Sequence, residues 1–242
     1  KYMHQILSLS NDAYEEIFQE IDTSGLVERK GIIYIWTNKN LKSRELEIKV
    51  RDDLGIKQKL LNQKEILELE PNLNPVFDAG ILYDYAMHAR DPHGILKKLF
   101  KLYMKKGGKF IQTEITNIKQ ISGSETAISS GNEEFKFEKT VIASGAFSKK
   151  LTDQLGEKIP LDTERGYHVH FKDKDHLISR PVIFLDRGFG LTPMNQGLRA
   201  VGTVELGGLK NPPSKKRIEY IINCAKELLP QLGKHHDEWL GF

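Results

Sequence analysis

The feature that most constrains the fold of this chain is a series of short apolar segments that follow Pro160. These segments are RGYHVHF, PVIFLD, FGLTPM and LRAVGTVEL, and turn residues separate them. In the first segment Tyr167, Val169 and Phe171 recur at every second position, which is the repeat of side chains on one face of a strand. Short strands spaced by turns favour an antiparallel sheet. We therefore predict such a sheet for the chain beyond residue 160.

Helices are predicted where apolar positions recur at helical spacing between recognisable end signals. Asp91 is placed as an N-cap with Pro92 at the first helical position, and Gly107 ends the helix. Asn62 with Glu65 three residues later forms a capping-box pattern. The predicted helices are 3–20, 43–54, 62–70, 91–106 and 214–230, and Asn11-Asp12 could break or cap the first of them. A strand is predicted at 31–36, and the segment 72–90 is predicted to be turn-rich with short apolar pieces.

The middle of the chain predicts a mixed α/β unit. The segment 109–121 has the composition of a strand, and 122–131 resembles a hairpin. The stretch VIASGAFSKKL at 141–151 is typical of a short buried strand that ends at Ser144-Gly145-Ala146 and is followed by a polar helix start. The order of helix, strand, antiparallel excursion and buried strand suits a mixed sheet.

Composition excludes several classes of protein. The net charge of +3 arises from 36 basic and 33 acidic residues, which is too even to indicate a nucleic-acid-binding surface. No apolar run approaches the roughly 20 residues that span a bilayer. Cys224 is the only cysteine, so no intrachain disulfide can form and a reducing compartment is indicated. We therefore predict a cytoplasmic protein that binds no nucleic acid.

The sequence lacks the short motifs of several enzyme classes. The patterns G-x-G-x-x-G, G-x-x-x-x-G-K-[ST], H-E-x-x-H and G-x-S-x-G are all absent. His168 and His170 point to one face of a strand, but a metal site would need a third ligand that the sequence does not place. A polar cavity or a surface pair is the alternative, and we predict no metal. Arg199 and Glu205 are interpreted as structural charges on the sheet.

Five segments in a fixed order resemble a known family. RDPHGILKKLFKLYMKKGGKFIQTEITNI resembles the helix and strand that lead back to the flavin domain in the D-amino-acid oxidase family. VIASGAFSKKL resembles that family's strand ending V-x-A-(S/A)-G-(A/V)-(W/F)-S. PLDTERGYHVHF, LDRGFGLTPMNQGLRAVGTVELGG and EWLGF are similar to substrate-domain signatures of bacterial D-amino-acid dehydrogenases of the small-subunit type. Each motif alone is weak, but five in the family's order are specific.

The resemblance implies FAD as cofactor and a small-molecule amino acid as substrate. The expected reaction is hydride transfer from the α-carbon of a D-amino acid to flavin N5, which gives an imino acid that hydrolyses to a 2-oxo acid. Electrons would pass to an acceptor or the respiratory chain. Peripheral attachment to the inner face of the cell membrane is therefore an alternative to a purely cytoplasmic location. Oxidation of hydroxyproline, sarcosine or glycine on the same fold, and a non-catalytic binding module, are the alternatives.

The chain departs from the family pattern at both ends. The family begins with a strand, G-x-G-x-x-G and a helix that hold the pyrophosphate, and an arginine that pairs with the substrate carboxylate follows its W-x-G-x motif. Here that loop is absent, and Phe242 is the last residue after Trp239. We therefore expect a central fragment that binds FAD weakly or not at all and is inactive alone. Tightly bound, stoichiometric flavin in the purified chain would refute this expectation.

The resemblance implies an α+β fold, with an antiparallel-sheet substrate domain, flanking helices and an incomplete FAD-binding α/β domain. We expect residues 1–87 to form the N-terminal helix and the first part of the substrate domain. Residues 88–158 would form the partial FAD-binding domain, and 159–242 the second part of the substrate domain. An incomplete domain exposes a sheet edge or face, so a homodimer or local mobility is expected there.

The resemblance also implies cofactor-binding residues, and it assigns none to catalysis. Ser144, Gly145 and Ala146 match the strand end that approaches the flavin. A glycine at position 145 lets the backbone come close to a ligand. Ile115 matches the place where backbone groups hold the adenine side.

The predicted substrate-binding residues lie in three segments. His88 and Arg90 precede the helix start at Asp91. On RGYHVHF, alternation puts Arg165 and Tyr167 on one face and His168 on the other, and the sequence does not decide which face meets the flavin. A third segment occupies the strand where related oxidases place a substrate-contacting tyrosine. The full set is His88, Arg90, Arg165, Tyr167, His168, Phe189 and Thr192.

Overall fold

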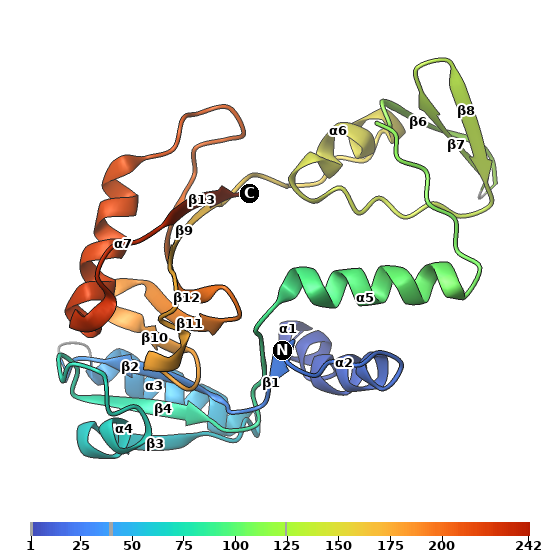
Figure 1. Ribbon diagram of the computed structural model, residues 1–242. Coiled ribbons are helices and arrows are strands. Elements are labelled where there is room, and N and C mark those ends of the chain that lie inside the picture. Colours follow the sequence, from blue (N-terminus) through green and yellow to red (C-terminus); the bar gives the residue numbers. More distant parts are fainter. Residues whose placement is uncertain (1, 39–40, 124) are drawn as a thin grey trace. The chain divides into compact units, whose positions relative to one another are not determined.

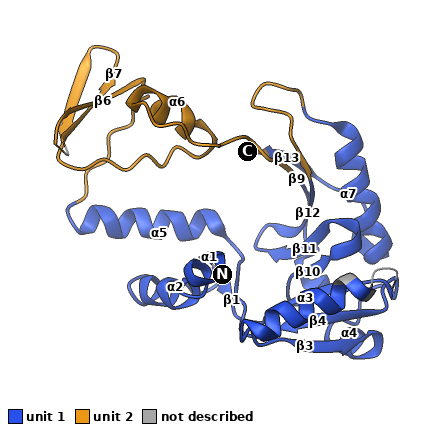
Figure 2. Ribbon diagram, turned by 180° about the vertical axis from the view of Figure 1, so that it is seen from behind, with its two compact units in different colours: residues 1–107, 167–203, 213–240 blue, residues 108–166, 204–212, 241–242 orange. Residues whose placement is uncertain are grey.

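The structure is a computed structural model that describes residues 2–38, 41–123 and 125–242 (Figure 1). The chain forms two compact units, which Figure 2 shows in different colours. Unit 1 comprises residues 1–107, 167–203 and 213–240, and unit 2 comprises residues 108–166, 204–212 and 241–242.

Unit 1 is built on an eight-stranded sheet. In spatial order its strands are β13 (Asp237–Gly241), β9 (Arg165–Phe171), β12 (Gly197–Glu205), β11 (Phe189–Met194), β10 (Val182–Phe184), β2 (Ile32–Trp36), β4 (Ala79–Tyr83) and β3 (Lys59–Asn62). β10 and β2 run parallel, whereas the pairs β12–β11, β11–β10, β2–β4 and β4–β3 are antiparallel. The predicted α+β class with an antiparallel sheet is therefore confirmed, and so are the segments beyond Pro160.

Alternation along β9 decides which face each of its residues takes. Arg165, Tyr167, Val169 and Phe171 are fully buried, and the residues between them are only partly buried. The period of two predicted for this segment is therefore confirmed, and it separates a core face of the sheet from a second, more accessible face.

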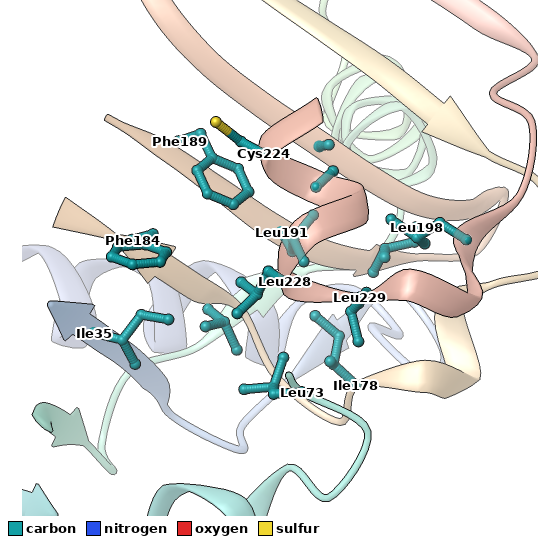
Figure 3. Close-up of a cluster of buried hydrophobic side chains, with 14 of the residues drawn as sticks. Ile35, Leu73, Ile178, Phe184, Phe189, Leu191, Leu198, Cys224, Leu228 and Leu229 are labelled. Atoms are coloured by element: carbon teal, nitrogen blue, oxygen red, sulfur yellow. The ribbon is translucent and has the colours of Figure 1, made fainter. Parts of the chain in front are cut away.

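The main core lies between the first of these faces and α7 (Lys215–Leu228) (Figure 3). Helix residues Ile218, Ile221, Cys224 and Leu228 recur at helical spacing, and all of them are buried. Burying one large aliphatic side chain in this way contributes roughly 1.5–3 kcal/mol. The strand side of the core includes Phe184, Phe189, Leu191, Leu198 and Ala200.

The second face of the sheet is covered over β2 and β4 by α3 (Leu41–Asp53). There Ile48 of the helix packs against a small cluster around Trp36 and Tyr83. Alternation explains this arrangement as well, because Ile35 on β2 points into the main core while Trp36 points to the other face. The same face at β11, β12 and β9 carries the cavity described below.

The N-terminal segment forms two helices, so an uninterrupted helix at 3–20 is wrong, and the break lies just before Asn11-Asp12, the place where a break was the alternative. These helices are α1 (Tyr2–Leu7) and α2 (Ser10–Gln19). At the break the Ser10 hydroxyl donates to the Leu7 carbonyl at 2.6 Å. A serine hydroxyl of this kind competes with helical backbone hydrogen bonds, which gives a physical reason for the interruption.

The segment predicted to be turn-rich at 72–90 contains the inner strand β4. Because β4 lies between β2 and β3 with Gly80 to Tyr83 all buried, its sequence AGILY shows no polar alternation. The segment also contains β5 (His88–Ala89), which pairs with β1 (Val27–Glu28). The prediction for this segment therefore failed where burial on both faces removes the pattern that marks a strand.

The two predicted helix caps are confirmed. At the start of α4 (Gln63–Leu69) the Asn62 side chain accepts from the Glu65 N–H at 3.0 Å, and the Glu65 carboxylate accepts from the Asn62 N–H at 2.8 Å. At the start of α5 (Pro92–Lys105) the Asp91 carboxylate accepts a 2.9 Å bond from the backbone N–H three residues later.

The boundaries of the compact units differ from those of the predicted domains. Residues 88–107, predicted for the FAD-binding domain, lie in unit 1, and residues 159–166, predicted for the substrate domain, lie in unit 2. Arg90 gives the physical reason for the first difference. Its guanidinium donates to Asp175 at 2.7 Å and to Asn195 at 2.9 Å, and these bonds tie the start of α5 to the sheet of unit 1.

Unit 2 contains a three-stranded antiparallel meander and a short helix. Its elements are β6 (Asn117–Ser122), β7 (Glu125–Ser130), β8 (Glu133–Phe137) and α6 (Ser148–Thr152). The hairpin predicted at 122–131 is confirmed by the β6–β7 pairing. The strand predicted at 109–121 begins only at Asn117, and the residues before it are irregular.

The buried strand predicted in VIASGAFSKKL is wrong. Residues 141–144 are irregular, the Val141 side chain is 87% exposed, and Gly145–Phe147 forms a 3-10 helix. An apolar run becomes a buried strand only where neighbouring strands satisfy its backbone hydrogen bonds. Within the described ranges no strand pairs with residues 141–144.

Two further observations bear on the class of protein. Among the residues that the structure describes, no three His, Cys, Asp or Glu side chains gather where they could hold a metal ion. None of the described helices has the length and apolar character needed to cross a membrane.

Candidate active site

A cavity of about 370 Å³ opens on the second face of the sheet in unit 1. Strands β9, β12 and β13 contribute His168, His170, Arg199 and Trp239, and the start of α5 borders the cavity. The alternation that sends Tyr167 into the core sends His168 and His170 to this face. The lining residues are Arg90, Asp91, Pro92, His93, His168, His170, Met194, Gln196, Arg199 and Trp239.

Arg199 and His170 form a hydrogen bond that fixes the protonation of the imidazole. The Arg199 Nε–H donates to His170 Nε2 at 2.9 Å. A guanidinium stays protonated in proteins, so Nε2 must be the acceptor and the His170 proton lies on Nδ1. Burial and the Arg199 charge hold the pKa of His170 below its ordinary value, against the opposing effect of Asp237. His170 is therefore neutral at neutral pH.

His168 lies between two other rings in this cavity. Its imidazole stacks on the Trp239 indole with ring centroids 4.7 Å apart and planes at 18°, and its centroid is 4.9 Å from that of His170. Burial, the Arg199 charge and His170 together lower the pKa of His168 to about 4. The cavity therefore holds these two neutral imidazoles beside the Arg199 cation.

The Arg199 charge has no compensating carboxylate among the described residues. Its one hydrogen bond goes to a neutral imidazole, and burial alone lowers the pKa of the guanidinium. A partly desolvated cation without a counter-ion is unfavourable, and such groups are normally paired. The site is therefore suited to an anionic ligand.

Arg90, which was predicted to bind substrate, borders the same cavity but is already paired. Its guanidinium donates to the Asp175 carboxylate at 2.7 Å and to the Asn195 side chain at 2.9 Å. The carboxylate neutralises the charge that a substrate anion would need. A substrate role for Arg90 stays a prediction, and its bonds show a positioning role at the start of α5.

Arg165 and Tyr167 lie on the core face of β9, away from the cavity. The Arg165 side chain is fully buried, with its Nε 3.5 Å from the Glu205 carboxylate and an Nη 3.1 Å from the Pro212 carbonyl. The Tyr167 hydroxyl accepts a 3.0 Å bond from the Ser214 N–H at the start of α7. The structure thus places these two predicted residues among packed side chains, and their substrate role stays a prediction.

Tyr167→Phe separates packing from substrate binding. We expect the variant to lose roughly 1 kcal/mol of unfolding free energy, because the Ser214 N–H loses its acceptor while the ring stays buried. Ligand affinity at the cavity should be unchanged. Urea denaturation and an NMR titration of the same preparation measure the two quantities, and a loss of affinity without a loss of stability would contradict this expectation.

The remaining predicted substrate residues lie apart from one another. Thr192 pairs with Arg199 across β11 and β12, so both point to the cavity face. Phe189 is 2% exposed in the main core. His88 lines a separate cavity of about 310 Å³, and burial is the main cause that lowers its pKa. Of the predicted set, only Arg90 and His168 line the cavity, and Thr192 shares its face.

Sequence patterns did not predict that Arg199, His170 and Trp239 line one cavity. Arg199 was interpreted as a structural charge on the sheet, yet Glu205 pairs with Arg165 instead. A signal was present in the sequence, because Glu205, the acidic residue of LRAVGTVEL that alternation puts on the same face, is too far along the strand from Arg199 to pair with it. An arginine in an apolar strand without a visible partner indicates a ligand site.

The predicted cofactor residues lie around two cavities of unit 2. Ile115 and Ser144 line the same cavity of about 560 Å³. Ala146 lines a second cavity of about 750 Å³, and Phe147 and Lys150 border both. These volumes are in the range of small-molecule and cofactor sites.

Gly145 lies in the chain between Ser144 and Ala146, with its backbone at φ +54°, a conformation that favours glycine. A Cβ built there would meet no atom within 4 Å, so the space beside the backbone is open to a ligand. The residues present in unit 2 therefore fit the near edge of a large cofactor.

The low pKa of His168 predicts a pH dependence of stability. The imidazole has an ordinary pKa of 6.5 when unfolded and about 4 when folded, so the unfolded chain takes up the proton first as pH falls. The stabilisation is complete above pH 6.5 and is lost as pH falls towards 4. After discounting for solvent screening we expect a loss of roughly 1–2 kcal/mol.

His168→Phe isolates this contribution, because other groups also titrate in the same range. Phenylalanine keeps a ring against Trp239 but takes up no proton. Urea denaturation between pH 7 and 4 should show a shallower fall for the variant than for the unaltered chain. Parallel curves for the two proteins would contradict the expectation.

The fold is that of known amino-acid oxidoreductases of similar architecture. L-proline dehydrogenase from P. horikoshii superposes with a TM-score of 0.84 at 18% identity, over 98% of this chain and 65% of that one. Glycine oxidase from Geobacillus kaustophilus superposes with a TM-score of 0.81 at 21% identity, over 97% of this chain and 64% of that one. Structural similarity at such low sequence identity establishes the fold alone.

The family follows from the sequence itself. Residues 1–242 match the family model DAO, described as FAD dependent oxidoreductase. The chain belongs to this family of FAD-dependent oxidoreductases, whose cofactor is FAD, and the resemblance found in the five segments is confirmed.

Two curated relatives are similar over most of the chain. A D-amino-acid oxidase of Bradyrhizobium diazoefficiens is 29% identical over 221 residues, which cover 91% of this chain and 52% of that protein. A D-amino acid dehydrogenase of Vibrio atlanticus is 24% identical over 247 residues, which cover 99% of this chain and 59% of that protein. The chain thus spans between half and three fifths of the length of these relatives.

Proposed function

We propose that the chain carries the substrate-binding part of an FAD-dependent enzyme that oxidises the α-carbon–amine bond of D-amino acids. The observation that carries the proposal is the partly buried Arg199 guanidinium, which lines a cavity and has no carboxylate partner among the described residues. The carboxylate of an amino acid supplies the missing charge. Relatives named D-amino-acid oxidase and D-amino acid dehydrogenase support this choice of substrate.

Arg199 would hold the substrate by its carboxylate, as a contact additional to the arginine that follows the W-x-G-x motif in the family. Its Nε–H is committed to His170, so the terminal nitrogens of the guanidinium are available to the ligand. A planar guanidinium binds a carboxylate through two parallel hydrogen bonds and thereby fixes the orientation of the molecule as well as its position. The stacked rings of His168 and Trp239 would form one wall and reduce the access of water.

The cofactor would be held in unit 2 by the four residues that the family resemblance assigns. The main chain at Ile115 and at Ser144 would line its cavity, and the open space beside Gly145 would admit it closely, with Ala146 next to it. When bound, FAD supplies the hydride acceptor that no amino-acid side chain provides. The product imino acid then hydrolyses to a 2-oxo acid.

The same proposal includes a further electron acceptor or the respiratory chain, a cytoplasmic location and a homodimer. Support for the acceptor comes from relatives named dehydrogenase. Sedimentation of the purified chain tests the dimer, because a single monomeric species over a wide concentration range would contradict it.

A substrate screen tests the reaction. The FAD-containing enzyme should reduce an artificial electron acceptor with D-amino acids, and more slowly with hydroxyproline, sarcosine or glycine. The cavity of about 370 Å³ supports the lower rate with glycine, because it exceeds the space that glycine fills. Activity confined to sarcosine or glycine would replace the proposed substrate class, and no activity with any amine would refute the proposal.

A further inference from the structure

His168 offers the cavity a hydrogen-bonding group that the protein itself does not use. Neither of its ring nitrogens has a hydrogen-bond partner among the described residues, although the ring is half-buried between Trp239 and His170. A half-buried imidazole that lines a cavity and has no protein partner presents its nitrogens to whatever fills the cavity, which favours a ligand contact there.

The surroundings of His168 determine that it acts as an acceptor. Arg199 lies on the neighbouring strand of the same face, and His170 lies beside it on β9, so a positive charge on His168 would be repelled. The pKa of about 4 agrees with this geometry. A neutral imidazole carries one N–H and one bare nitrogen, and the bare nitrogen accepts a hydrogen bond.

We propose that His168 accepts a hydrogen bond from the amino group of the substrate while Arg199 binds its carboxylate, an inference that rests on the proposed function. The two residues are linked through His170, whose Nε2 accepts from Arg199 and whose ring lies 4.9 Å from that of His168. One cationic donor and one neutral acceptor that line the same cavity correspond to the two polar groups on the α-carbon of an amino acid. A ligand that has the carboxylate but no amino group leaves the acceptor unpaired.

Asp91 is the rival acceptor at the same cavity. Its carboxylate already accepts from the Gly94 N–H as the N-cap of α5, but an acidic group also attracts an ammonium. Asp91→Ser keeps a side chain that caps helices well and removes the charge. This variant therefore separates Asp91 from His168.

The test compares two probes that differ by the amino group. The 242-residue chain is titrated with D-alanine and with propionate at pH 8, and the dissociation constants are followed by NMR. We expect D-alanine to bind about 3–10-fold more tightly than propionate, as one added hydrogen bond implies. His168→Phe should abolish this preference and leave propionate binding unchanged, and His168→Gln, which keeps an acceptor, should retain part of it.

The outcomes separate this inference from the proposed function. If neither probe binds, or if Arg199→Met leaves propionate binding unchanged, the cavity is not a carboxylate site and both proposals fall. If both probes bind equally, or if His168→Phe keeps the preference for D-alanine, the inference about His168 alone is overturned. A preference that Asp91→Ser abolishes assigns the amino group to Asp91 and overturns it as well. Thermal unfolding of each variant confirms that it is folded.

Discussion

We expect Arg199→Met to lower the affinity for carboxylate ligands and kcat/KM about 100-fold or more. A charge-assisted hydrogen bond contributes about 1.5–3 kcal/mol, and Arg199 lines the cavity without a carboxylate partner among the described residues. Methionine fills a similar volume without charge. Titration with propionate measures the affinity on the 242-residue chain, and steady-state kinetics measures kcat/KM on the FAD-containing enzyme.

Stability decides whether Arg199 serves binding or structure. If its charge serves a ligand, removing a partly desolvated cation leaves the free energy of unfolding within about 1 kcal/mol of the original, even with the His170 bond lost. If the arginine is structural, the variant is destabilised and binding falls only as far as folding does. Loss of stability with normal affinity in the folded fraction would contradict our assignment.

Two further substitutions are matched controls for Arg199. Arg199→Lys keeps the charge but loses the planar fork, so we expect a partial loss of affinity. Arg29→Met removes a cation from an exposed pair with Glu15, in which the arginine side chain is 47% exposed. It should change neither affinity nor, beyond about 0.5 kcal/mol, stability. The comparison shows that the effect belongs to the cavity and not to net charge.

The sheet could be predicted where one face is buried and the other is not. On β9 the period of two can be recognised in the sequence because Tyr167 and Val169 lie in the main core while His168 and His170 line the cavity. On β4 both faces are covered, so the sequence carries no contrast between them. For residues 141 to 144 a strand was predicted where none forms. Their apolar composition suggested a strand, but no described neighbouring strand pairs with their backbone groups.

The candidate site was less predictable than the fold because it depends on pairing across strands. His168 was recognised from its strand, but the face that matters was undecided until β13 placed Trp239 against it. Arg199 is separated from its neighbour His170 by 29 residues, and nothing local shows that the hydrogen bond leaves its charge uncompensated. Motifs of the family indicated the cofactor correctly, since they summarise such long-range relations in short sequences.

Glu70→Ala is expected to lower the free energy of unfolding by about 3–5 kcal/mol. The residue is 1% exposed, and its carboxylate accepts from the Ser179 N–H at 2.8 Å, the Ser179 hydroxyl at 2.5 Å and the Arg180 Nε–H at 3.0 Å. Removing one member of a buried pair leaves the other charge uncompensated. The loss is a large part of the 5–15 kcal/mol that stabilises a typical domain.

The size of this effect follows from where Glu70 lies in the topology. It is the C-cap residue of α4, and its partners precede β10, the strand that runs parallel to β2. Two parallel strands such as β2 and β10 need a long connection between them. The Glu70 carboxylate binds Ser179, 109 residues further along the chain, just before β10 begins, and so it fixes the end of that connection. Glu68→Ala, in an exposed pair with Lys64, should cost less than about 0.5 kcal/mol. Urea denaturation of both variants decides the matter, since equal losses would show that burial and position add nothing to the pair.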